Sequence, residues 1–570
     1  MIQEKIKKLI RESLEKLGIE TKEVSLEHPD EISNGDFSTN VALVHVKASG
    51  MNPRKFADEI VRYVVQNKPE EIEKVEVAGA GFINFYLSRE FFTKEVSAAL
   101  KEGENFGKSS TLKGKKIMVE YTDPNPFKEF HVGHLMDNAI GESVARLIDF
   151  QGAKVLRACW QGDVGLHVAK ALWGIMKNRK ILPKDSDTVS QKAKFLGEAY
   201  TLGAGEFETN EAVKAEIKEL NKKIFERSDA AVNELYDKGR AWSLEYFEGI
   251  YKKLGTKFDY YFFEGKEGLE GKPIVEEFLK KGVFEKSDGA VVFKGEQHGL
   301  HTRVFINSQG LPTYEAKELG LNKKKFELEK LDLSIILSAN EINEYFRVLL
   351  KVMELVYPKI GEKTKHLSHG FLKLPEGKMS SRTGNVITGE SLISAVESMV
   401  HKKLEERELE TVEKNKIAEV VAIGAIKYSI LKQAIGSDII YDFEKSISFE
   451  GDSGPYLQYS YVRAKSVLAK ALAEKIKPDF KHVPEEISLL ERLLVRFPEV
   501  VGRAGSEYSP HLVATYLTEL AGSFNSYYAK NQIVNVADPT SSYKAALTES
   551  FAATMKNGLW LLGIQVPEHM

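Results

Sequence analysis

The sequence predicts an α/β protein with three parts: a small α+β domain, a domain built on a parallel sheet, and an all-helical domain. Two short apolar runs, "KKIMVEYT" and "KVLRACW", bracket a long helical segment at a spacing that fits a βαβ unit. After about residue 390, strand-like runs fade and helical periodicity dominates. The chain of 570 residues is also long enough for roughly three or four domains.

The composition is that of a folded, water-soluble protein, with 42% hydrophobic and 29% charged residues. No apolar run approaches the roughly 18 residues that cross a bilayer, and the N-terminus lacks the apolar core of a signal peptide. We therefore expect a cytoplasmic protein without membrane contact. The single cysteine, Cys159, excludes an internal disulfide framework and a cysteine-rich zinc site. The net charge of -3 gives no support to nucleic-acid binding, which would have to depend on local surfaces.

Residues 1–110 predict the α+β domain. The chain opens with an amphipathic pattern in which apolar residues recur every four positions, at Ile2, Ile6, Ile10 and Leu14. Further on, "VEVAGAGFINFYL" alternates like a strand after a glycine-rich turn. A helix followed by strands within one short segment predicts a small domain of mixed structure.

Residues 111–390 contain the βαβ pattern. "HVGHLMDNAIGESVARLIDF" is the expected crossover helix, and "LSIILSAN" resumes the buried-strand character downstream. Between them lie a Lys/Glu-rich helical insertion near residues 175–250 and a β-rich segment with Asp-Gly and Gln-Gly turn signals. Such a pattern predicts a parallel sheet with its ligand site at the carboxyl ends of the strands. Residues 391–570 follow as the helical domain.

His131 and His134 flank a glycine at the start of the expected crossover helix. Taken alone, the pair fits three explanations: zinc ligands, buried structural imidazoles, or donors to a phosphate. The metalloprotease motif is absent, because it needs a spacing of four and a catalytic glutamate. A helix N-terminus after a buried strand binds anions through its free N–H groups, Gly133 lets a ligand approach the backbone, and Lys128 adds positive charge. Far downstream, "LPEGKMSSRTGN" adds a cationic, hydroxyl-rich loop.

Together, "HVGH" and "KMSSRTGN" resemble the His-Ile-Gly-His and Lys-Met-Ser-Lys-Ser signatures of class I aminoacyl-tRNA synthetases. Further segments look like the arginyl branch of that family, namely "VEYTDPNPFKEFHVGHL", "QGDVGLH", "GLPTYEAKEL" and "EGDSGPYLQYSYVRAKSVL". The likeness covers nearly the whole chain. It implies a Rossmann-like catalytic domain at 111–390, a tRNA-elbow (D-loop) binding domain at 1–110 and an anticodon-binding domain at 391–570.

The activity implied by the resemblance is arginine–tRNA ligation. The arginine carboxylate attacks the α-phosphate of ATP, pyrophosphate leaves, and the adenylate is passed to the 3′-terminal ribose of arginine tRNA. Because the nucleophile belongs to the substrate, the protein has to position the reactants and stabilise charge. Mg²⁺ is expected on the nucleotide rather than in a dedicated metal cage. The partners are L-arginine, ATP and arginine tRNA, and we expect a monomer.

The resemblance places the phosphate chemistry around the helix start, a strand end and the downstream loop. The implied catalytic residues are Lys128, His131, His134 and Lys378, and the implied ATP-binding residues are His131, Gly133, His134, Gly162, Asp163, Gly165, Lys378, Met379, Ser380 and Ser381. The chain departs from the signature at Ser381, where a second lysine is usual. Lys128 is the expected substitute for that missing charge.

A guanidinium offers five N–H donors in a planar fork and can be desolvated only against carboxylates and other acceptors. The implied arginine-binding residues are Asp123, Asn125, His134, Glu264, Tyr314, Glu318 and Glu341. Asp123 stands where serine is common, Glu318 where aspartate is usual, and Glu341 where glutamine is usual. Tyr314 and Glu318 are four residues apart, so on a helix they share one face.

The RNA-binding candidates are mostly aromatic, amide and basic residues, because exposed aromatics stack on unpaired bases and arginine adds charge. The resemblance places Phe37, Asn40, Phe82 and Asn84 toward the tRNA elbow, and Tyr456, Arg463, Tyr528 and Met570 toward the anticodon. Core packing is the alternative explanation for the tyrosines and for Phe82.

Two other functions remain open from the sequence. One is a class I synthetase for another amino acid, although a glutamyl or glutaminyl enzyme needs a cationic pocket or an amide reader, and a cysteinyl enzyme needs a cysteine-ligated zinc site. The other is a non-catalytic RNA-binding paralogue, against which the retained His131, His134 and Lys378 argue.

Overall fold

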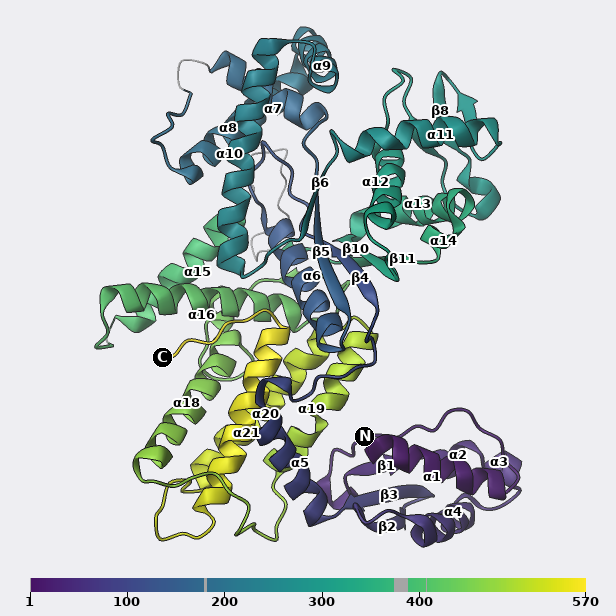
Figure 1. Ribbon diagram of the computed structural model, residues 1–570, viewed down its shortest axis with the longest axis vertical. Helices are drawn as coiled ribbons and strands as arrows, with labels where there is room; N and C mark the ends of the chain where they lie inside the picture. Colours follow the sequence, from purple (N-terminus) through teal and green to yellow (C-terminus); the bar gives the residue numbers. More distant parts are fainter. Residues whose placement is uncertain (1, 179–181, 374–387, 406) are drawn as a thin grey trace. The chain divides into compact units, whose positions relative to one another are not determined.

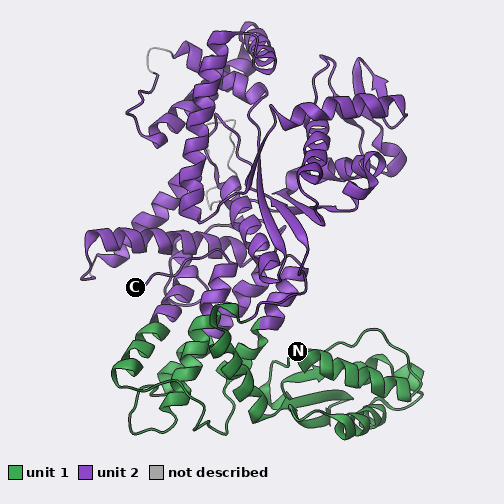
Figure 2. Cartoon of the chain, viewed as in Figure 1, with its two compact units in different colours: residues 1–106, 463–497, 522–554 green, residues 107–462, 498–521, 555–570 purple. Residues whose placement is uncertain are grey.

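The computed structural model describes residues 2–178, 182–373, 388–405 and 407–570. The chain forms two compact units, each assembled from segments that are distant in sequence (Figure 2). The first unit comprises residues 1–106, 463–497 and 522–554, and the second comprises residues 107–462, 498–521 and 555–570. The C-terminal segments are therefore divided between the two units.

The N-terminal part of the first unit is a three-stranded antiparallel sheet in the order β1-β3-β2, with helices beside it (Figure 1). The strands are β1 (Phe37–Thr39), β2 (Ile72–Ala78) and β3 (Phe82–Leu87), and the helices are α1 (Ile2–Lys16), α2 (Val41–Val44), α3 (Val46–Ser49), α4 (Pro53–Asn67) and α5 (Arg89–Glu102). The four-residue repeat of α1 buries Ile6, Ile10 and Leu14. The predicted α+β composition of this segment is confirmed.

The second unit is built on a five-stranded parallel sheet in the order β11-β10-β4-β5-β6 (Figure 1). Its strands are β4 (Lys116–Glu120), β5 (Lys154–Gln161), β6 (Tyr260–Phe263), β10 (Leu333–Ala339) and β11 (Thr364–His369). Helix α6 (Val132–Phe150) connects β4 to β5, which confirms the predicted βαβ unit. The chain proceeds from β4 to β5 and β6 and later returns to β10 on the other side of β4. Open α/β sheets bind ligands at such a switch point, beyond the carboxyl ends of the strands.

Two insertions interrupt the sheet. Helices α7 (Leu166–Lys177), α8 (Val189–Thr209), α9 (Glu211–Glu226) and α10 (Ala230–Leu254) share an apolar core and include the stretch predicted as helical. Strands β7 (Glu285–Ser287), β8 (Ala290–Phe293) and β9 (Arg303–Ile306) then form a small antiparallel sheet. Its first turn is the predicted Asp-Gly pair. Asp288 and Gly289 both have positive φ, as a tight hairpin requires.

Helices make up most of the remaining chain. They are α11 (Gly271–Lys280), α12 (Tyr314–Leu328), α13 (Asn343–Val356), α14 (Pro358–Gly361), α15 (Gly389–Leu404), α16 (Thr411–Leu431), α17 (Phe443–Ser446), α18 (Gly454–Ala473), α19 (Leu489–Ser506), α20 (Pro510–Lys530) and α21 (Ser541–Leu561). Strands β12 (Leu372–Lys373) and β13 (Ile439–Ile440) form a minimal parallel pair. Among the described residues, we find no helix whose length and apolarity would let it span a bilayer.

Candidate active site

The two histidines cap the N-terminus of α6. His131 is the N-cap residue, and its Nδ1 accepts hydrogen bonds from the backbone N–H groups of Gly133 and His134, at 3.1 and 3.3 Å. The Nδ1 of His134 accepts a hydrogen bond from the backbone N–H of His131 at 3.2 Å. Because Nδ1 is the acceptor in both rings, the proton of each neutral imidazole lies on Nε2.

Both imidazoles are neutral near pH 7. Burial, together with the positive charge of Lys128, lowers the pKa of His131 to about 4, and burial lowers the pKa of His134 well below its usual range. The two rings stack with their centroids 3.5 Å apart. The helix start therefore offers two Nε2–H donors. The backbone N–H groups of Gly133 and His134, which we expected to be free for an anion, are occupied by the His131 ring instead.

Lys128 lies close to these rings. Its Nζ is 4.6 Å from the centre of the Tyr200 ring, and its charge lowers the pKa of His131, His134 and His167. Burial lowers the pKa of Lys128 itself. In the described part of the chain, no carboxylate forms an ion pair with it. The predicted loop residues Lys378, Met379, Ser380 and Ser381 lie outside the described residues.

Close backbone contacts follow β5. A Cβ atom at position 162 would lie 2.3 Å from Asn125 Oδ1 and 3.2 Å from Glu264 Oε1, so Gly162 lets both side chains close over the backbone. Gly165 precedes α7 with φ +122°, a conformation that favours glycine. His167 Nε2 lies 2.7 Å from the carbonyl oxygen of Gly162. The structure therefore brings the predicted residues Asn125, Gly162 and Glu264 together.

Asp163 ties the end of β5 to neighbouring elements. Its Oδ2 accepts hydrogen bonds from the Tyr236 hydroxyl at 3.1 Å and from Arg240 Nε at 2.9 Å. Its Oδ1 accepts one from the backbone N–H of Gly265 at 2.8 Å. The carboxylate thus fixes the turn in which the predicted ATP-binding glycines lie.

Glu120, at the end of β4, lies within electrostatic range of both Asp123 and Glu318, and Asp123 also lies within range of Asp137. Asp123 Oδ1 accepts a hydrogen bond from the backbone N–H of Trp160 at 2.6 Å. Burial and the charges of Glu120 and Asp137 raise the pKa of Asp123 well above its usual range. Burial and the charge of Glu120 also raise the pKa of Glu318, to about 8. Burial is the larger cause of both shifts, and the like charges add to it, so a cation bound here would favour the ionised carboxylates.

Two buried lysines of α12 offset part of this negative charge. Lys317 Nζ lies 2.7 Å from Glu264 Oε2, and Lys325 Nζ lies 2.8 Å from Glu120 Oε2. All four side chains are at least 93% buried, the most exposed being Lys317 at 7%. Charges withdrawn from water in this way persist only when paired.

The remaining predicted arginine-binding residues differ in position. Tyr314 begins α12, and the charge of Glu264 raises its pKa. Glu318 follows one turn later, where it is buried and accepts a hydrogen bond from Asn322 at 3.3 Å. Glu341 is exposed in the turn after β10, and it forms no hydrogen bond or ion pair with the residues that the structure describes. The structure therefore groups Tyr314 with Glu264 but does not bring Glu341 to them.

The predicted tRNA-elbow residues differ in exposure. Phe82 is 43% exposed on β3, whereas Phe37 and Asn84 are buried in the same sheet. Asn84 Oδ1 accepts a hydrogen bond from Ser38 Oγ at 2.7 Å. Asn40 is half-buried at the N-cap of α2. Phe82 is thus the aromatic side chain of this set that solvent reaches.

Two of the predicted anticodon-binding residues lie together in the first unit. The guanidinium carbon of Arg463 is 5.5 Å from the centre of the Tyr528 ring, and Arg463 Nη1 donates a hydrogen bond to Asn525 Oδ1 at 2.5 Å. Tyr528 is 39% exposed. Tyr456, half-buried at the start of α18, and the terminal Met570 belong to the second unit.

The sequence does not identify several titratable residues that form ion pairs at the site or interact with its charges. They are Glu120, Asp137, His167, Lys317, Lys325, Tyr345 and His369. Glu120 could have been found, because it is a charged residue at the end of a buried strand. The lysines could not, because the Lys/Glu-rich sequence of α12 does not distinguish buried from solvated charges.

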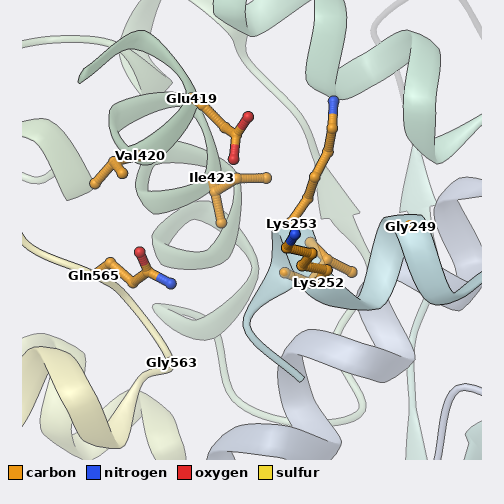
Figure 3. A pocket seen from close by; sticks show the side chains of 9 residues that line it. Gly249, Lys252, Lys253, Glu419, Val420, Ile423, Gly563 and Gln565 are labelled. Atoms are coloured by element: carbon orange, nitrogen blue, oxygen red, sulfur yellow. The ribbon is translucent and has the colours of Figure 1, made fainter. Parts of the chain in front are cut away.

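A separate pocket of about 450 Å³ lies in the second unit, between the end of α10, α16 and the C-terminal tail (Figure 3). Its lining residues are Gly249, Lys252, Lys253, Leu254, Glu419, Val420, Ile423, Gly563 and Gln565. None of the predicted site residues that the structure describes is among them. The pocket is therefore distinct from the carboxylate site.

Family models match almost the whole chain. The model for "tRNA synthetases class I (R), catalytic domain" matches residues 95–443, "Arginyl tRNA synthetase N terminal domain" matches residues 4–87, and "DALR anticodon binding domain" matches residues 457–570. The fold, the paired imidazoles and the catalytic-domain match define a class I aminoacyl-tRNA synthetase.

Individual relatives narrow the class. The chain is 31% identical to the arginine–tRNA ligase of Clostridium perfringens, over 99% of this chain and 100% of the relative, and 30% identical to that of Treponema denticola, over 99% and 98%. The Thermus thermophilus arginyl-tRNA synthetase structure has the same fold, with a TM-score of 0.82 at 23% identity over 100% of both chains. The chain belongs to the arginyl-tRNA synthetase family.

Proposed function

We propose that this protein activates L-arginine with ATP and transfers the arginyl group to the 3′ end of arginine tRNA, releasing AMP and pyrophosphate. The observation that carries the proposal is the group of buried carboxyl groups at the switch point of the sheet, in the same unit as the imidazoles that begin α6. Substrate arginine carries two positive charges, a guanidinium and an α-ammonium. The raised pKa values of Asp123 and Glu318 indicate that a cation is favoured there.

The activation step follows from the donors around this pocket. The arginine carboxylate attacks the α-phosphate, the bond from that phosphorus to the bridging oxygen breaks, and pyrophosphate leaves. The Nε2–H groups of His131 and His134 donate to phosphate oxygens as their charge develops. Lys128 and Lys378 supply positive charge, and Lys128 compensates for the lysine that Ser381 replaces. Neutral imidazoles with fixed Nδ1 contacts are preorganised for this role.

The substrate pocket is assigned to the grouped residues. Glu264, Tyr314 and Glu318 receive the guanidinium, and Asp123 and Asn125 receive the α-ammonium. We assign Mg²⁺ to ATP, where phosphate oxygens and water would hold it.

The flanking regions are assigned to tRNA. Residues 1–110 bind the elbow, residues 111–390 catalyse the reaction and residues 391–570 bind the anticodon. The three family-model matches support the order of these parts, but the catalytic match continues to residue 443 and the anticodon-binding match begins at residue 457. Exposed Phe82 is the leading elbow contact, and the Arg463–Tyr528 pair is the leading anticodon contact because it offers an aromatic face and a cation. We further propose that the protein acts as a cytoplasmic monomer.

Amino-acid-dependent pyrophosphate exchange, measured with and without arginine tRNA, tests the function. We expect exchange with arginine when tRNA is present, followed by arginylation of that tRNA. Exchange with a different amino acid would reassign the enzyme. The absence of both exchange and arginylation with every arginine-accepting tRNA would leave a non-catalytic RNA-binding role.

A further inference from the structure

The ion pair between Lys317 and Glu264 lies inside the pocket assigned to the arginine side chain. Lys317 is on α12, three residues after Tyr314, and Glu264 follows β6. Their side chains are 7% and 2% exposed, and Lys317 Nζ donates to Glu264 Oε2 at 2.7 Å. The Lys317 ammonium therefore binds one oxygen of Glu264, the carboxylate that we expect to bind the guanidinium of the substrate.

The Lys317 side chain is held in place along its length. A Cβ atom at position 268 would lie 2.9 Å from Lys317 Cγ, so the lysine stem packs against the backbone of Gly268. Its Nζ is 5.1 Å from the centre of the Tyr314 ring and 5.5 Å from that of Phe225. Aromatic faces at these distances attract an ammonium. The ammonium is thus fixed by packing, by two rings and by one carboxylate oxygen.

The other oxygen of Glu264 lies near Gly162. Oε1 would lie 3.2 Å from a Cβ atom at position 162, and Asn125 Oδ1 would lie 2.3 Å from the same point. Among the described residues, no hydrogen-bond donor is bound to Glu264 Oε1. Lys317 therefore leaves Oε1 of Glu264 available beside Asn125 and takes up one acceptor position of Oε2.

We propose that Lys317 is a positioning residue that sets the amino-acid specificity of the pocket. By holding Glu264 Oε2, it orients Oε1 for a guanidinium N–H and occupies the place where a compact ammonium group would bind. A lysine or ornithine substrate would need that place, because an ammonium is a point charge, whereas a planar guanidinium can bind acceptors spread around it. This inference rests on the proposed function.

Removing the Lys317 charge has a second consequence. The lysine opposes the effect of burial on the pKa of Glu264, which burial already raises. In Lys317→Met, the apolar stem is kept but the carboxyl loses its cation, so its pKa rises further and it is neutral over more of the pH range. A smaller fraction of the protein then presents the ionised carboxylate to an arginine substrate.

The experiment compares tRNA-dependent pyrophosphate exchange with arginine, lysine and ornithine for the wild type, Lys317→Met, Lys317→Arg and Lys324→Met. Lys324 is the matched control, because it lies on the same helix in a half-buried ion pair with Glu270 at 3.6 Å. In Lys317→Met we expect the arginine KM at pH 7 to rise about tenfold or more with kcat changed much less, and the preference for arginine over lysine to fall about tenfold or more. Lys317→Arg should restore both quantities, and the excess KM of Lys317→Met should shrink at pH 8.5.

The outcomes distinguish failure of the proposed function from failure of the proposed role of Lys317. A wild-type protein that does not use arginine contradicts the proposed function itself. An active wild type together with unchanged KM and preference in Lys317→Met overturns the role of Lys317. If Lys317→Met loses its cooperative thermal transition, Lys317→Gln takes its place, and the same two quantities decide.

Discussion

Lys128 is the residue to which we assign the missing positive charge of the phosphate site. Its charge reaches the rings of His131, His134 and His167, and in the described part of the chain no carboxylate neutralises it. We expect Lys128→Ala to slow arginine-dependent pyrophosphate exchange at least tenfold, or about 1.4 kcal/mol of transition-state stabilisation. Lys238→Ala is the control, since Lys238 also lies near an aromatic ring, 5.2 Å from the centre of Trp242, and is not among the residues assigned to the site. A Lys128→Ala rate close to that of the control would remove Lys128 from the mechanism.

If Glu318 binds the substrate guanidinium as proposed, we expect arginine binding to depend on pH. Burial and the charge of Glu120 raise its pKa to about 8, so below that pH the free protein holds this carboxyl largely protonated. A guanidinium favours the ionised form, and binding therefore releases a proton. The arginine KM should fall as pH rises from 6 toward 8, by up to about tenfold per pH unit, and then level off.

Glu318→Gln removes the titrating group and should flatten this dependence while raising the KM overall. The KM for ATP, measured in the same reactions, serves as the reference for pH effects that arise elsewhere. An arginine KM that is independent of pH in the wild type would show that Glu318 is ionised throughout the range.

At the scale of elements, one residue at the N-terminus of α6 has two proposed roles: His131 caps the helix and donates to a phosphate. A histidine is an unusual cap, and here one ring closes the helix with Nδ1 while Nε2–H remains for a ligand. Asparagine is a good N-cap residue whose side chain can accept the same backbone N–H bonds. His131→Asn should therefore retain the thermal stability of the wild type but lose about tenfold or more in pyrophosphate exchange.

His131→Ala, by contrast, should lose both properties, because it removes the cap as well as the donor; the cap alone is worth about 1 kcal/mol. Thermal melting and pyrophosphate exchange on the same preparations separate the two effects. Wild-type exchange in His131→Asn would mean that the ring only caps the helix.

The elements that could be predicted are those whose apolar pattern repeats within one segment. Strands β4 and β5 are continuous apolar runs, and α1 repeats its apolar residues every four positions, so each is visible locally. Strand β11 is polar in sequence, "TKHLSH", and neither it nor the four-residue β6 was predicted. The candidate site follows the same rule. Its histidine motif was visible, whereas the partners of Glu120 and Glu264 come from α12, some 200 and 50 residues downstream, and only the fold brings them there.

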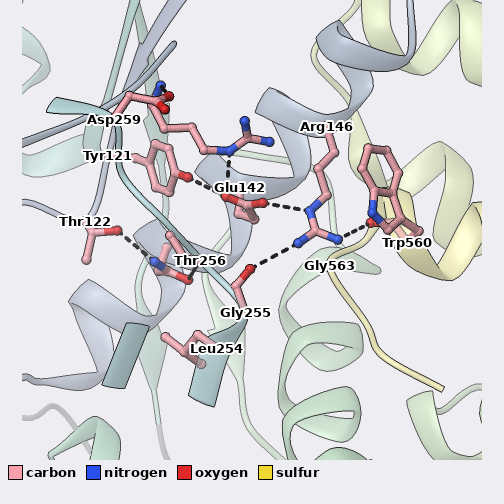
Figure 4. A network of polar contacts seen from close by, with 12 residues as sticks. Tyr121, Thr122, Glu142, Arg146, Leu254, Gly255, Thr256, Asp259, Trp560 and Gly563 are labelled. Carbon is pink, nitrogen blue, oxygen red and sulfur yellow. Dashed lines mark hydrogen bonds and ion pairs between the residues drawn. The ribbon is translucent and has the colours of Figure 1, made fainter. Parts of the chain in front are cut away.

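At the scale of the whole molecule, residues near the end of the chain contact helix α6 within the second unit. Ser143 Oγ donates to the carbonyl oxygen of Leu561 at 2.8 Å, and Arg146 Nη1 donates to that of Trp560 at 2.9 Å. Arg146 Nε also donates a hydrogen bond to Glu142 Oε1 at 2.7 Å (Figure 4). The other oxygen of Glu142 accepts a hydrogen bond from the hydroxyl of Tyr121, which follows β4. Residues at opposite ends of the unit's sequence thus share one polar network beneath the site.

Lys427 of α16 also contacts the C-terminal tail, and its titration should make the stability of the fold depend on pH. Its Nζ is buried and donates to the carbonyl oxygens of Leu254 at 2.6 Å and Gly563 at 2.7 Å, so a neutral amine with two N–H groups satisfies both acceptors. Burial lowers its pKa to about 7, whereas a lysine in the unfolded chain titrates near ~10.4. Between pH 7 and the pKa of the unfolded chain, Lys427 is protonated in the unfolded state but largely neutral in the folded state. The free energy of unfolding should therefore rise with pH over this range.

Lys427→Met should remove this contribution. We expect the difference in unfolding free energy between wild type and Lys427→Met to increase from pH 7 to pH 9 in favour of the wild type, by at most about 1.4 kcal/mol per pH unit. Denaturant melts at several pH values measure it, and Lys416→Met, an exposed position on the same helix, should parallel the wild type. Parallel curves for the wild type and Lys427→Met would show that Lys427 stays protonated in the folded protein. Its two carbonyl contacts would then hold an ammonium, and the tail would be attached through a buried charge.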